Sequence, residues 1–169
     1  MTAYEFARKA HEGQMYGEHP YTVHLFDVQQ IALQVNDPAL SNHYLSAVAF
    51  LHDVVEDTEV TVDEVRAEFG EFVAGAVELL TDPEGPNRKA RKALLHERLS
   101  QLDKTRIDER AALIVKTADR CANVRAANSE GREDLLKMYR GEHPDFQRAV
   151  WRPGLCDSLW EELTQLLGA

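Results

Sequence analysis

The sequence predicts an all-α protein, a bundle of helices around a hydrophobic core. Three observations favour this class. Apolar residues recur at helical spacing along most of the chain, and no stretch reads as a convincing strand. The length of 169 residues, with 44% hydrophobic residues, is sufficient for one domain with a sizeable core. No linker rich in Pro, Gly or Ser divides the chain, so we expect a single domain over residues 1–169.

Helix breakers punctuate the first part of the chain. Gly13 ends the first helix, and the turn-forming residues 14–20 follow it. The Asn-Asp-Pro sequence at residues 36–38 ends the second helix. Ser41 or Asn42 can cap the third. These signals predict helices over residues 3–10, 22–35 and 45–58.

The second part of the chain continues the helical pattern. Thr61, followed three residues later by Glu64, has the form of a capping box that starts a short helix. Residues 81–86 are rich in Asp, Pro and Gly and predict a loop. A strongly basic helix follows that loop. The helices expected here cover residues 61–69, 72–80, 87–102, 108–127, 135–139 and 155–167.

Composition limits the classes of partner. The net charge of -10 argues against a general nucleic-acid binder, because the phosphate backbone would be repelled. The N-terminus lacks the basic and apolar regions of a secretory signal, and no stretch approaches the roughly 18–20 apolar residues of a membrane span. Cys121 and Cys156 stand alone, which suits a reducing compartment. We therefore expect a cytoplasmic protein that binds neither nucleic acid nor a membrane, with homo-oligomerisation left open.

Polar chemistry concentrates near the end of the predicted helix 45–58. This helix is largely apolar up to Leu51, and this part is followed by four polar residues that lie close together, His52, Asp53, Glu56 and Asp57. At 3.6 residues per turn, the four side chains are expected to share one broad face. Unpaired burial of such groups is costly, and a bound divalent cation would offset that cost. The alternative is a helix that ends in solvent, with its acidic residues capping a loop.

Two further side chains can complete a metal site. His24 begins the second helix, and Asp119 interrupts an otherwise apolar helix. Together with His52 and Asp53 they would supply two imidazoles and two carboxylates, a mixed set that suits Mn²⁺, Fe²⁺ or Zn²⁺. The alternatives are a histidine that is satisfied in the core or lies on the surface, and an aspartate that a neighbouring cation neutralises.

The chain also carries an ordered set of motifs, each in a helical context. They are Ala10-His11-Glu12-Gly13-Gln14, Pro20-Tyr21-Thr22-Val23-His24, His52-Asp53-Val54-Val55-Glu56-Asp57-Thr58, Phe69-Gly70 and Lys116-Thr117-Ala118-Asp119-Arg120-Cys121-Ala122-Asn123. This set resembles the HD-domain hydrolases of guanosine tetra- and pentaphosphate, the hydrolase halves of bifunctional stringent-response enzymes and their short stand-alone relatives. The resemblance covers about residues 3–127. It implies an HD-domain helical bundle that hydrolyses the 3′-pyrophosphate ester to give GDP or GTP and pyrophosphate.

The resemblance also implies residue roles. The side chains that match the family's metal ligands, usually for Mn²⁺, are His24, His52, Asp53 and Asp119. Glu56 and Asp57 match its acidic pair, which positions and activates the attacking water, and Asn123 matches a residue beside the nucleotide. The residues by themselves agree with this chemistry, because a cation lowers the pKa of bound water and a nearby carboxylate can take its proton.

The loop after Gln14 departs from the family pattern. Family members commonly carry an arginine or lysine there that stacks on the guanine, whereas this chain has Tyr16 and no arginine. Tyr16 could stack on a base instead. The departure keeps a second hypothesis open, an HD phosphohydrolase acting on another phosphorylated nucleotide such as NADPH or a nucleoside phosphate. A third hypothesis is a non-catalytic metal- or nucleotide-binding module, which the intact pair of Glu56 and Asp57 disfavours.

Further candidates for substrate binding come from charge and aromaticity. Arg88, Lys89 and Lys92 cluster at the start of the basic helix and could hold substrate phosphates through charge-assisted hydrogen bonds. A solvated helix face is the alternative. Tyr139 could stack on the nucleotide or pack in the core.

Overall fold

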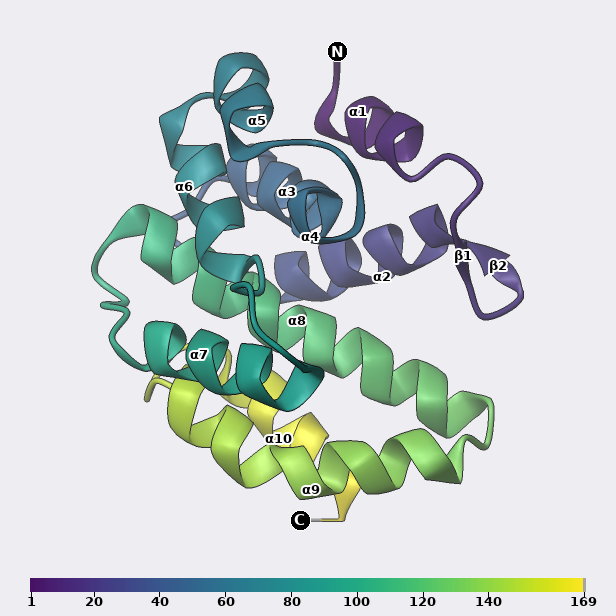
Figure 1. Ribbon diagram of the computed structural model, residues 1–169. Helices are drawn as coiled ribbons and strands as arrows, with labels where there is room; N and C mark the ends of the chain where they lie inside the picture. Colours follow the sequence, from purple (N-terminus) through teal and green to yellow (C-terminus); the bar gives the residue numbers. More distant parts are fainter. Residues whose placement is uncertain (169) are drawn as a thin grey trace.

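A 23-residue helix, α8 (Ile107–Ser129), runs through the middle of the fold. In the computed structural model, which describes residues 1–168, α8 contacts α2, α3 and α6 on one side and α9 and α10 on the other (Figure 1). The all-α prediction is confirmed. The remaining helices are α1 (Ala3–Ala10), α2 (Tyr21–Gln34), α3 (Asn42–Leu51), α4 (Val54–Asp57), α5 (Val62–Phe69), α6 (Glu71–Leu80), α7 (Arg88–Ser100), α9 (Glu133–Val150) and α10 (Asp157–Leu167).

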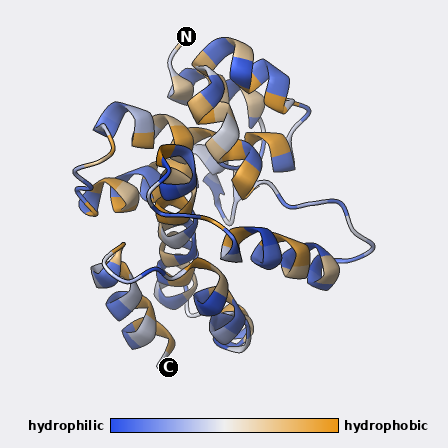
Figure 2. Cartoon of the chain, turned by 90° about the vertical axis from the view of Figure 1, so that its left-hand side faces the viewer, coloured by the Kyte–Doolittle hydropathy of each residue, from blue (hydrophilic) through white to orange (hydrophobic). Residues whose placement is uncertain are grey.

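The centre of α8 is buried on every face. Residues 111–118 are all buried without interruption. A helix that is enclosed all round belongs to the core, whereas the surrounding helices need only one apolar stripe. Figure 2 shows this second pattern, with hydrophobic and hydrophilic residues alternating around the turns of the outer helices. Any polar side chain on the buried part of α8 therefore needs a partner inside the protein.

Helix caps lie where the sequence predicts them. The Ser41 hydroxyl accepts a hydrogen bond from the backbone N–H of Tyr44, so Ser41 rather than Asn42 begins α3. Thr61 and Glu64 form both hydrogen bonds of a capping box at the start of α5. These local interactions satisfy N–H groups that have no partner within the helix.

The prediction of one continuous helix over residues 45–58 is wrong. The helix α3 ends at Leu51, and α4 begins only at Val54. Between them Asp53 leaves helical geometry, with φ -106° and ψ -3°. Its carboxylate accepts a hydrogen bond from the hydroxyl of Tyr21 on α2.

Two other expectations need correction. Residues 14–20 were expected to lack strands, but β1 (Met15–Tyr16) pairs antiparallel with β2 (His19–Pro20) in a small hairpin. The helix expected at residues 135–139 is part of the longer α9, which continues past Pro144. Packing explains this extension, because α9 buries apolar residues against α7, α8 and α10.

The buried apolar residues of the helices form one core cluster. The assignment of residues 1–169 to a single domain stays a prediction. Across residues 1–168, every helix is too short or too polar to cross a membrane.

Candidate metal centre

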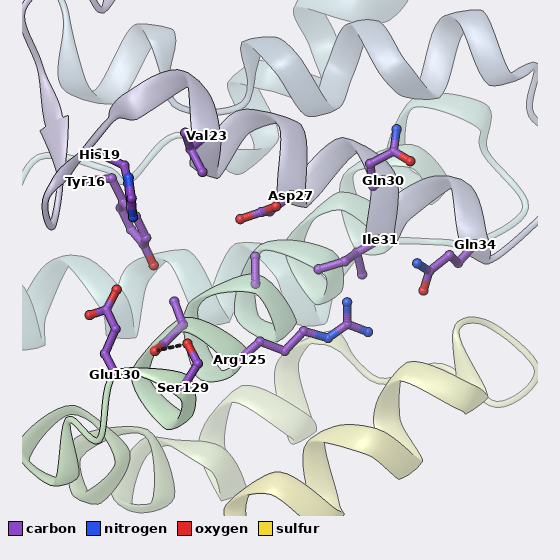
Figure 3. A pocket seen from close by; sticks show the side chains of 12 residues that line it. Tyr16, His19, Val23, Asp27, Gln30, Ile31, Gln34, Arg125, Ser129 and Glu130 are labelled. Carbon is purple, nitrogen blue, oxygen red and sulfur yellow. Dashed lines mark hydrogen bonds between the residues drawn. The ribbon is translucent and has the colours of Figure 1, made fainter.

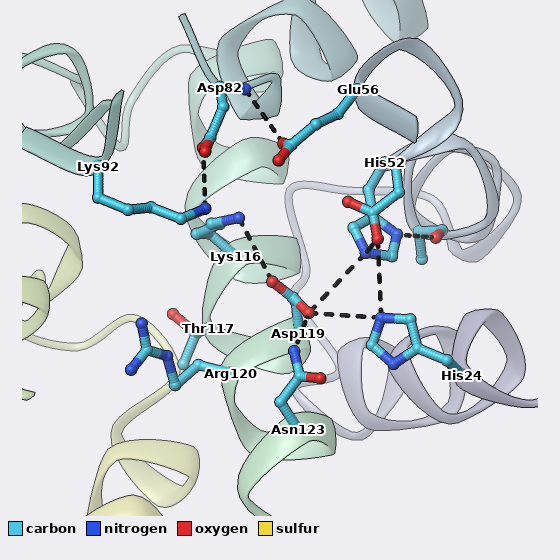
Figure 4. Close-up of polar contacts among 12 residues, drawn as sticks. His24, His52, Glu56, Asp82, Lys92, Lys116, Thr117, Asp119, Arg120 and Asn123 are labelled. Carbon is cyan, nitrogen blue, oxygen red and sulfur yellow. Dashed lines mark hydrogen bonds and ion pairs between the residues drawn. The ribbon is translucent and has the colours of Figure 1, made fainter. Parts of the chain in front are cut away.

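The predicted metal ligands converge in space although they come from three parts of the chain. His24 lies on α2, His52 and Asp53 lie in the break between α3 and α4, and Asp119 lies on α8 (Figure 4). The Nε2 atom of His24 is 3.5 Å from Oδ1 of Asp119 and 3.8 Å from Oδ2 of Asp53. The Nε2 atom of His52 is 2.8 Å from Oδ2 of Asp53 and 3.9 Å from Oδ1 of Asp119. Ligand atoms of His24, His52 and Asp119 therefore gather in one place, and Oδ2 of Asp53 lies beside both histidines.

The orientation of His52 favours a cation at that point. Its Nδ1 lies 2.8 Å from the carbonyl oxygen of Ala49, so the Nδ1–H group donates there and leaves Nε2 directed at the carboxylates. Nε2 is buried and has no hydrogen-bond partner of suitable geometry. Burial alone would lower the pKa of His52, but the carboxylate of Asp53 raises it to about 9. The carboxylates would thus stabilise a positive charge at this point, whether a proton or a metal ion.

This donor set fits a divalent metal. Ligand atoms of His24, His52 and Asp119 lie within 4.8 Å of one another, and both histidines are almost fully buried. Two imidazoles with carboxylate oxygens suit Mn²⁺, Fe²⁺ and Zn²⁺ alike.

Three neighbouring side chains hold the two carboxylates in place. The hydroxyl of Tyr21 donates to Oδ2 of Asp53 at 2.5 Å. The amide of Asn123 donates to Oδ1 of Asp119 at 2.6 Å, and the ammonium of Lys116 donates to Oδ2 of Asp119 at 3.3 Å. Burial opposes ionisation of Asp119, but Lys116 and the two histidines hold its pKa well below the usual range.

Tyr21 was given no role at the site, whereas Lys116 was expected only as one possible cation that neutralises Asp119. Tyr21 precedes His24 by three residues, and Lys116 precedes Asp119 by three residues. Residues three apart on a helix are neighbours on one face. The three-residue spacing is the sequence signal that places Tyr21 beside His24 and Lys116 beside Asp119.

The predicted catalytic pair has separate partners. Glu56 accepts a hydrogen bond from the backbone N–H of Asp82 at 3.2 Å, whereas Asp57 accepts one from the amide of Gln14 at 3.3 Å. Partial burial raises the pKa of Glu56, although Lys92 and Lys116 oppose the shift. Figure 4 shows Glu56 beside His52, on the side where Asp82 and Lys116 lie.

Two predicted nucleotide-binding residues adjoin the predicted ligands. The ring of Tyr16 stacks on the ring of His24, with centroids 4.7 Å apart. Its hydroxyl donates to Oδ1 of Asn123 at 2.7 Å. Beyond Tyr16, a cavity of about 420 Å³ lies between α2 and α8 and is lined by charged groups of Asp27, Arg125 and Glu130 (Figure 3).

The predicted phosphate-binding residues of α7 lie in another pocket. Arg88, Lys89 and Lys92 line a cavity of about 480 Å³ between α7 and α9. Arg88 forms an ion pair with Glu142, and Lys92 donates to Oδ1 of Asp82 at 2.9 Å. Asp82 therefore links Lys92 to Glu56, because its side chain accepts a hydrogen bond from Lys92 and its backbone N–H donates one to Glu56.

Tyr139 has a cationic partner on one face of its ring. The guanidinium of Arg120 lies 4.8 Å from the centre of its ring. That contact occupies one aromatic face, so Tyr139 is placed as a partner of Arg120.

The fold and the donor set together define a class, an all-helical protein with a buried histidine–carboxylate centre suited to a divalent cation. The chain belongs to the HD-domain family, whose sequence pattern matches residues 3–141.

Relatives with similar sequences carry stringent-response names. The guanosine-3′,5′-bis(diphosphate) 3′-pyrophosphohydrolase of Vibrio cholerae is 32% identical over 124 residues, which cover 73% of this chain and 17% of that protein. The protein of the same name from Aquifex aeolicus is 34% identical over 125 residues, which cover 73% of this chain and 17% of that protein. The GTP pyrophosphokinase rsh of Brucella melitensis is 30% identical over 165 residues, which cover 97% of this chain and 21% of that protein. The chain thus spans about a fifth of the length of these relatives.

Solved structures confirm the helical fold. A structure described as a metazoan ortholog of SpoT that hydrolyzes ppGpp is similar with a TM-score of 0.73 and 24% identity, covering 98% of this chain and 93% of that one. A protein of Listeria monocytogenes EGD-e is similar with a TM-score of 0.65 and 25% identity, and the match covers 91% of this chain and 96% of that one.

Proposed function

We propose that this protein is a metal-dependent hydrolase of guanosine 3′,5′-polyphosphates that releases pyrophosphate from the 3′ position and leaves GDP or GTP. The observation that carries the proposal is the gathering of His24, His52 and Asp119 within 4.8 Å, with the carboxylate of Asp53 beside both histidines. The names of the sequence relatives supply the substrate class.

Different residues of this chain would hold the cation, orient the water and accept its proton. A divalent cation, with Mn²⁺ as our proposal, supplies an acidified water and charge neutralisation when it is bound. His24, His52, Asp53 and Asp119 would hold it. Glu56 would orient the water and take its proton, a task that its raised pKa favours. Asp57 would help to position the same water, and the departing 3′-oxygen would take up a proton.

The nucleotide would bind on the side of Tyr16 and Asn123. Tyr16 already stacks on His24 and hydrogen-bonds Asn123, so the other face of its ring offers a platform for a base. Arg88, Lys89 and Lys92 remain proposals for phosphate contacts, and Tyr139 remains a proposal for nucleotide stacking.

A second substrate class deserves the same test, because the hairpin segment 14–20 contains neither arginine nor lysine. Without a cation stacked on the guanine, an HD phosphohydrolase could act on another phosphorylated nucleotide such as NADPH or a nucleoside phosphate. The cytoplasmic location, the lack of nucleic-acid or membrane binding and a homo-oligomeric state stay predictions.

The deciding experiment is a turnover panel with protein loaded with Mn²⁺. Guanosine tetraphosphate, NADPH and ordinary nucleotides are compared for release of pyrophosphate or phosphate. Selective release of pyrophosphate from the tetraphosphate is the expected result. Turnover of a different panel member alone would keep the hydrolytic centre and discard the guanosine substrate. Metal binding with no turnover of any member would favour a binding module.

A variant of Glu56 tests the chemical role within the same panel. Glu56→Gln should bind Mn²⁺ as wild type does and lose about 100-fold or more of turnover, the usual contribution of a general base. Glu161→Gln, on the exposed surface of α10, is the matched control and should keep full activity. Full activity of Glu56→Gln would remove the proposed role of Glu56.

A further inference from the structure

Lys116 is a buried cation that the proposed mechanism does not use. It lies on α8 within the fully buried run 111–118 and is only 9% exposed. Its ammonium forms an ion pair with the carboxylate of Asp119, with Nζ 3.3 Å from Oδ2. The ammonium therefore stays charged in a region from which charge is normally excluded.

The hydrogen bonds of this ammonium are incomplete. A lysine ammonium has three donor hydrogens. Within residues 1–168, Lys116 has one acceptor, Oδ2 of Asp119, at the rather long distance of 3.3 Å. Lys92, nearby on α7, instead makes a shorter bond of 2.9 Å to Asp82. Lys116 thus keeps donor capacity that its described protein neighbours do not use.

Its position explains what such donors could contact. Figure 4 shows the Lys116 ammonium between Asp119 and the pair formed by Glu56 and Asp82. Asp119 directs its other oxygen, Oδ1, at the two histidines. Lys116 is therefore separated from the predicted cation position by one carboxylate, on the side of the predicted general base.

We propose that Lys116 binds a non-bridging oxygen of the substrate's pyrophosphate group and holds that group beside the cation position. This inference rests on the proposed function and adds a phosphate-contacting residue to it. An ammonium with unused donors is a strong partner for a phosphate oxygen. The competing role is purely structural, with Lys116 acting only as the counter-ion of Asp119.

Inorganic pyrophosphate is the probe that separates these roles. It is titrated calorimetrically into Mn²⁺-saturated protein, with the free Mn²⁺ concentration held equal in cell and syringe. The variants are Lys116→Met, Lys116→Gln and Lys116→Arg. The control is Lys137→Met, which changes the net charge equally at an exposed position of α9. Mn²⁺ affinity and thermal unfolding are measured for each protein.

Loss of one charge-assisted contact should weaken pyrophosphate binding at least tenfold in Lys116→Met and Lys116→Gln. Lys116→Arg should stay within about threefold of wild type, because it retains charge and donors, and Lys137→Met should match wild type. Mn²⁺ affinity should change less than pyrophosphate affinity. If one uncharged variant unfolds, the other is compared with Lys116→Arg.

Three results would overturn the proposal. They are wild-type pyrophosphate affinity in a folded uncharged variant, loss of Mn²⁺ affinity in parallel with that of pyrophosphate, and no pyrophosphate binding by wild type at millimolar concentration. Failure of the proposed function would look different. Wild type would then bind pyrophosphate in a Lys116-dependent manner but would not hydrolyse guanosine tetraphosphate.

Discussion

The Nε2 atom of His52 lies 2.8 Å from Oδ2 of Asp53, the next residue in the chain. Adjacent residues in a regular helix point about 100° apart, so this contact depends on the break between α3 and α4. The break turns both side chains of the His-Asp pair toward His24 and Asp119. Helix interruption is thus a requirement of the candidate metal centre.

Replacing Asp53 by Asn tests that centre directly. The substitution keeps the shape of the side chain but removes a negative charge that a divalent cation needs, so Mn²⁺ affinity should fall by more than about 100-fold, beyond the effect typical of outer-shell changes. Isothermal calorimetry measures the affinity. Asp63→Asn, at an exposed position of α5, is the control. Wild-type affinity in Asp53→Asn would exclude Asp53 as a ligand.

Tyr21→Phe tests the support of the same carboxylate. It removes the hydroxyl that donates to Asp53 at 2.5 Å, and loss of an outer-shell hydrogen bond typically lowers metal affinity about 10–100-fold. Tyr44→Phe is a matched control, because the Tyr44 hydroxyl also donates a tertiary hydrogen bond, to the carbonyl of Phe72. Equal Mn²⁺ affinities in the two variants would contradict a role for Tyr21 at the centre.

The raised pKa of His52 predicts how stability depends on pH in protein treated with a chelator. A raised pKa means that the folded state binds the proton more tightly than the unfolded state, whose value is near 6.5. This stabilisation is complete below pH 6.5 and is lost as the pH rises toward about 9. The melting temperature should therefore fall across this interval.

Saturating Mn²⁺ should oppose that fall, because a metal ion replaces the proton at higher pH. Melting curves of wild type and His52→Gln, with and without Mn²⁺, provide the measurement. A pH dependence that persists unchanged in His52→Gln would assign it to another group.

The variant Asp37→Asn tests a contribution to protein stability that does not involve the candidate metal centre. Arg110 of α8 binds both carboxylate oxygens of Asp37, at 2.6–3.0 Å, and the Asp37 side chain is only 4% exposed. Losing this pair should cost roughly 1.5–3 kcal/mol of unfolding free energy, the range for hydrogen bonds to charged groups. Chemical denaturation measures the loss, and Mn²⁺ affinity should not change.

The loss of stability at acidic pH is an independent check on the ion pair of Asp37 and Arg110. Burial raises the pKa of Asp37, but Arg110 outweighs it and lowers the pKa overall. The stabilisation is therefore present above the unfolded value and is lost as the pH falls through the lowered one. Asp37→Asn should remove this part of the acid sensitivity. An unaltered acid profile would show that the pair contributes little.

The sequence by itself determined the helical class, most helix boundaries and the identity of the candidate ligands. Ser41 and Thr61 cap their helices as expected, because capping depends on residues only three positions apart. His52, Asp53 and Asp119 stood out because imidazoles and carboxylates are unusual in apolar helices, and the resemblance to the HD-domain hydrolases added His24 to the predicted ligands.

Only the tertiary structure decided how those residues meet. The carboxylate of Asp53, at the break between α3 and α4, accepts a hydrogen bond from a hydroxyl of α2 that is 32 positions away in the chain. The pairing of Tyr16 with Asn123 spans 107 positions, and the contact of Arg120 with Tyr139 joins two helices. Local propensity and helical periodicity describe interactions within a few residues. Contacts between distant segments arise only when the core packs, and they set the geometry of the candidate site.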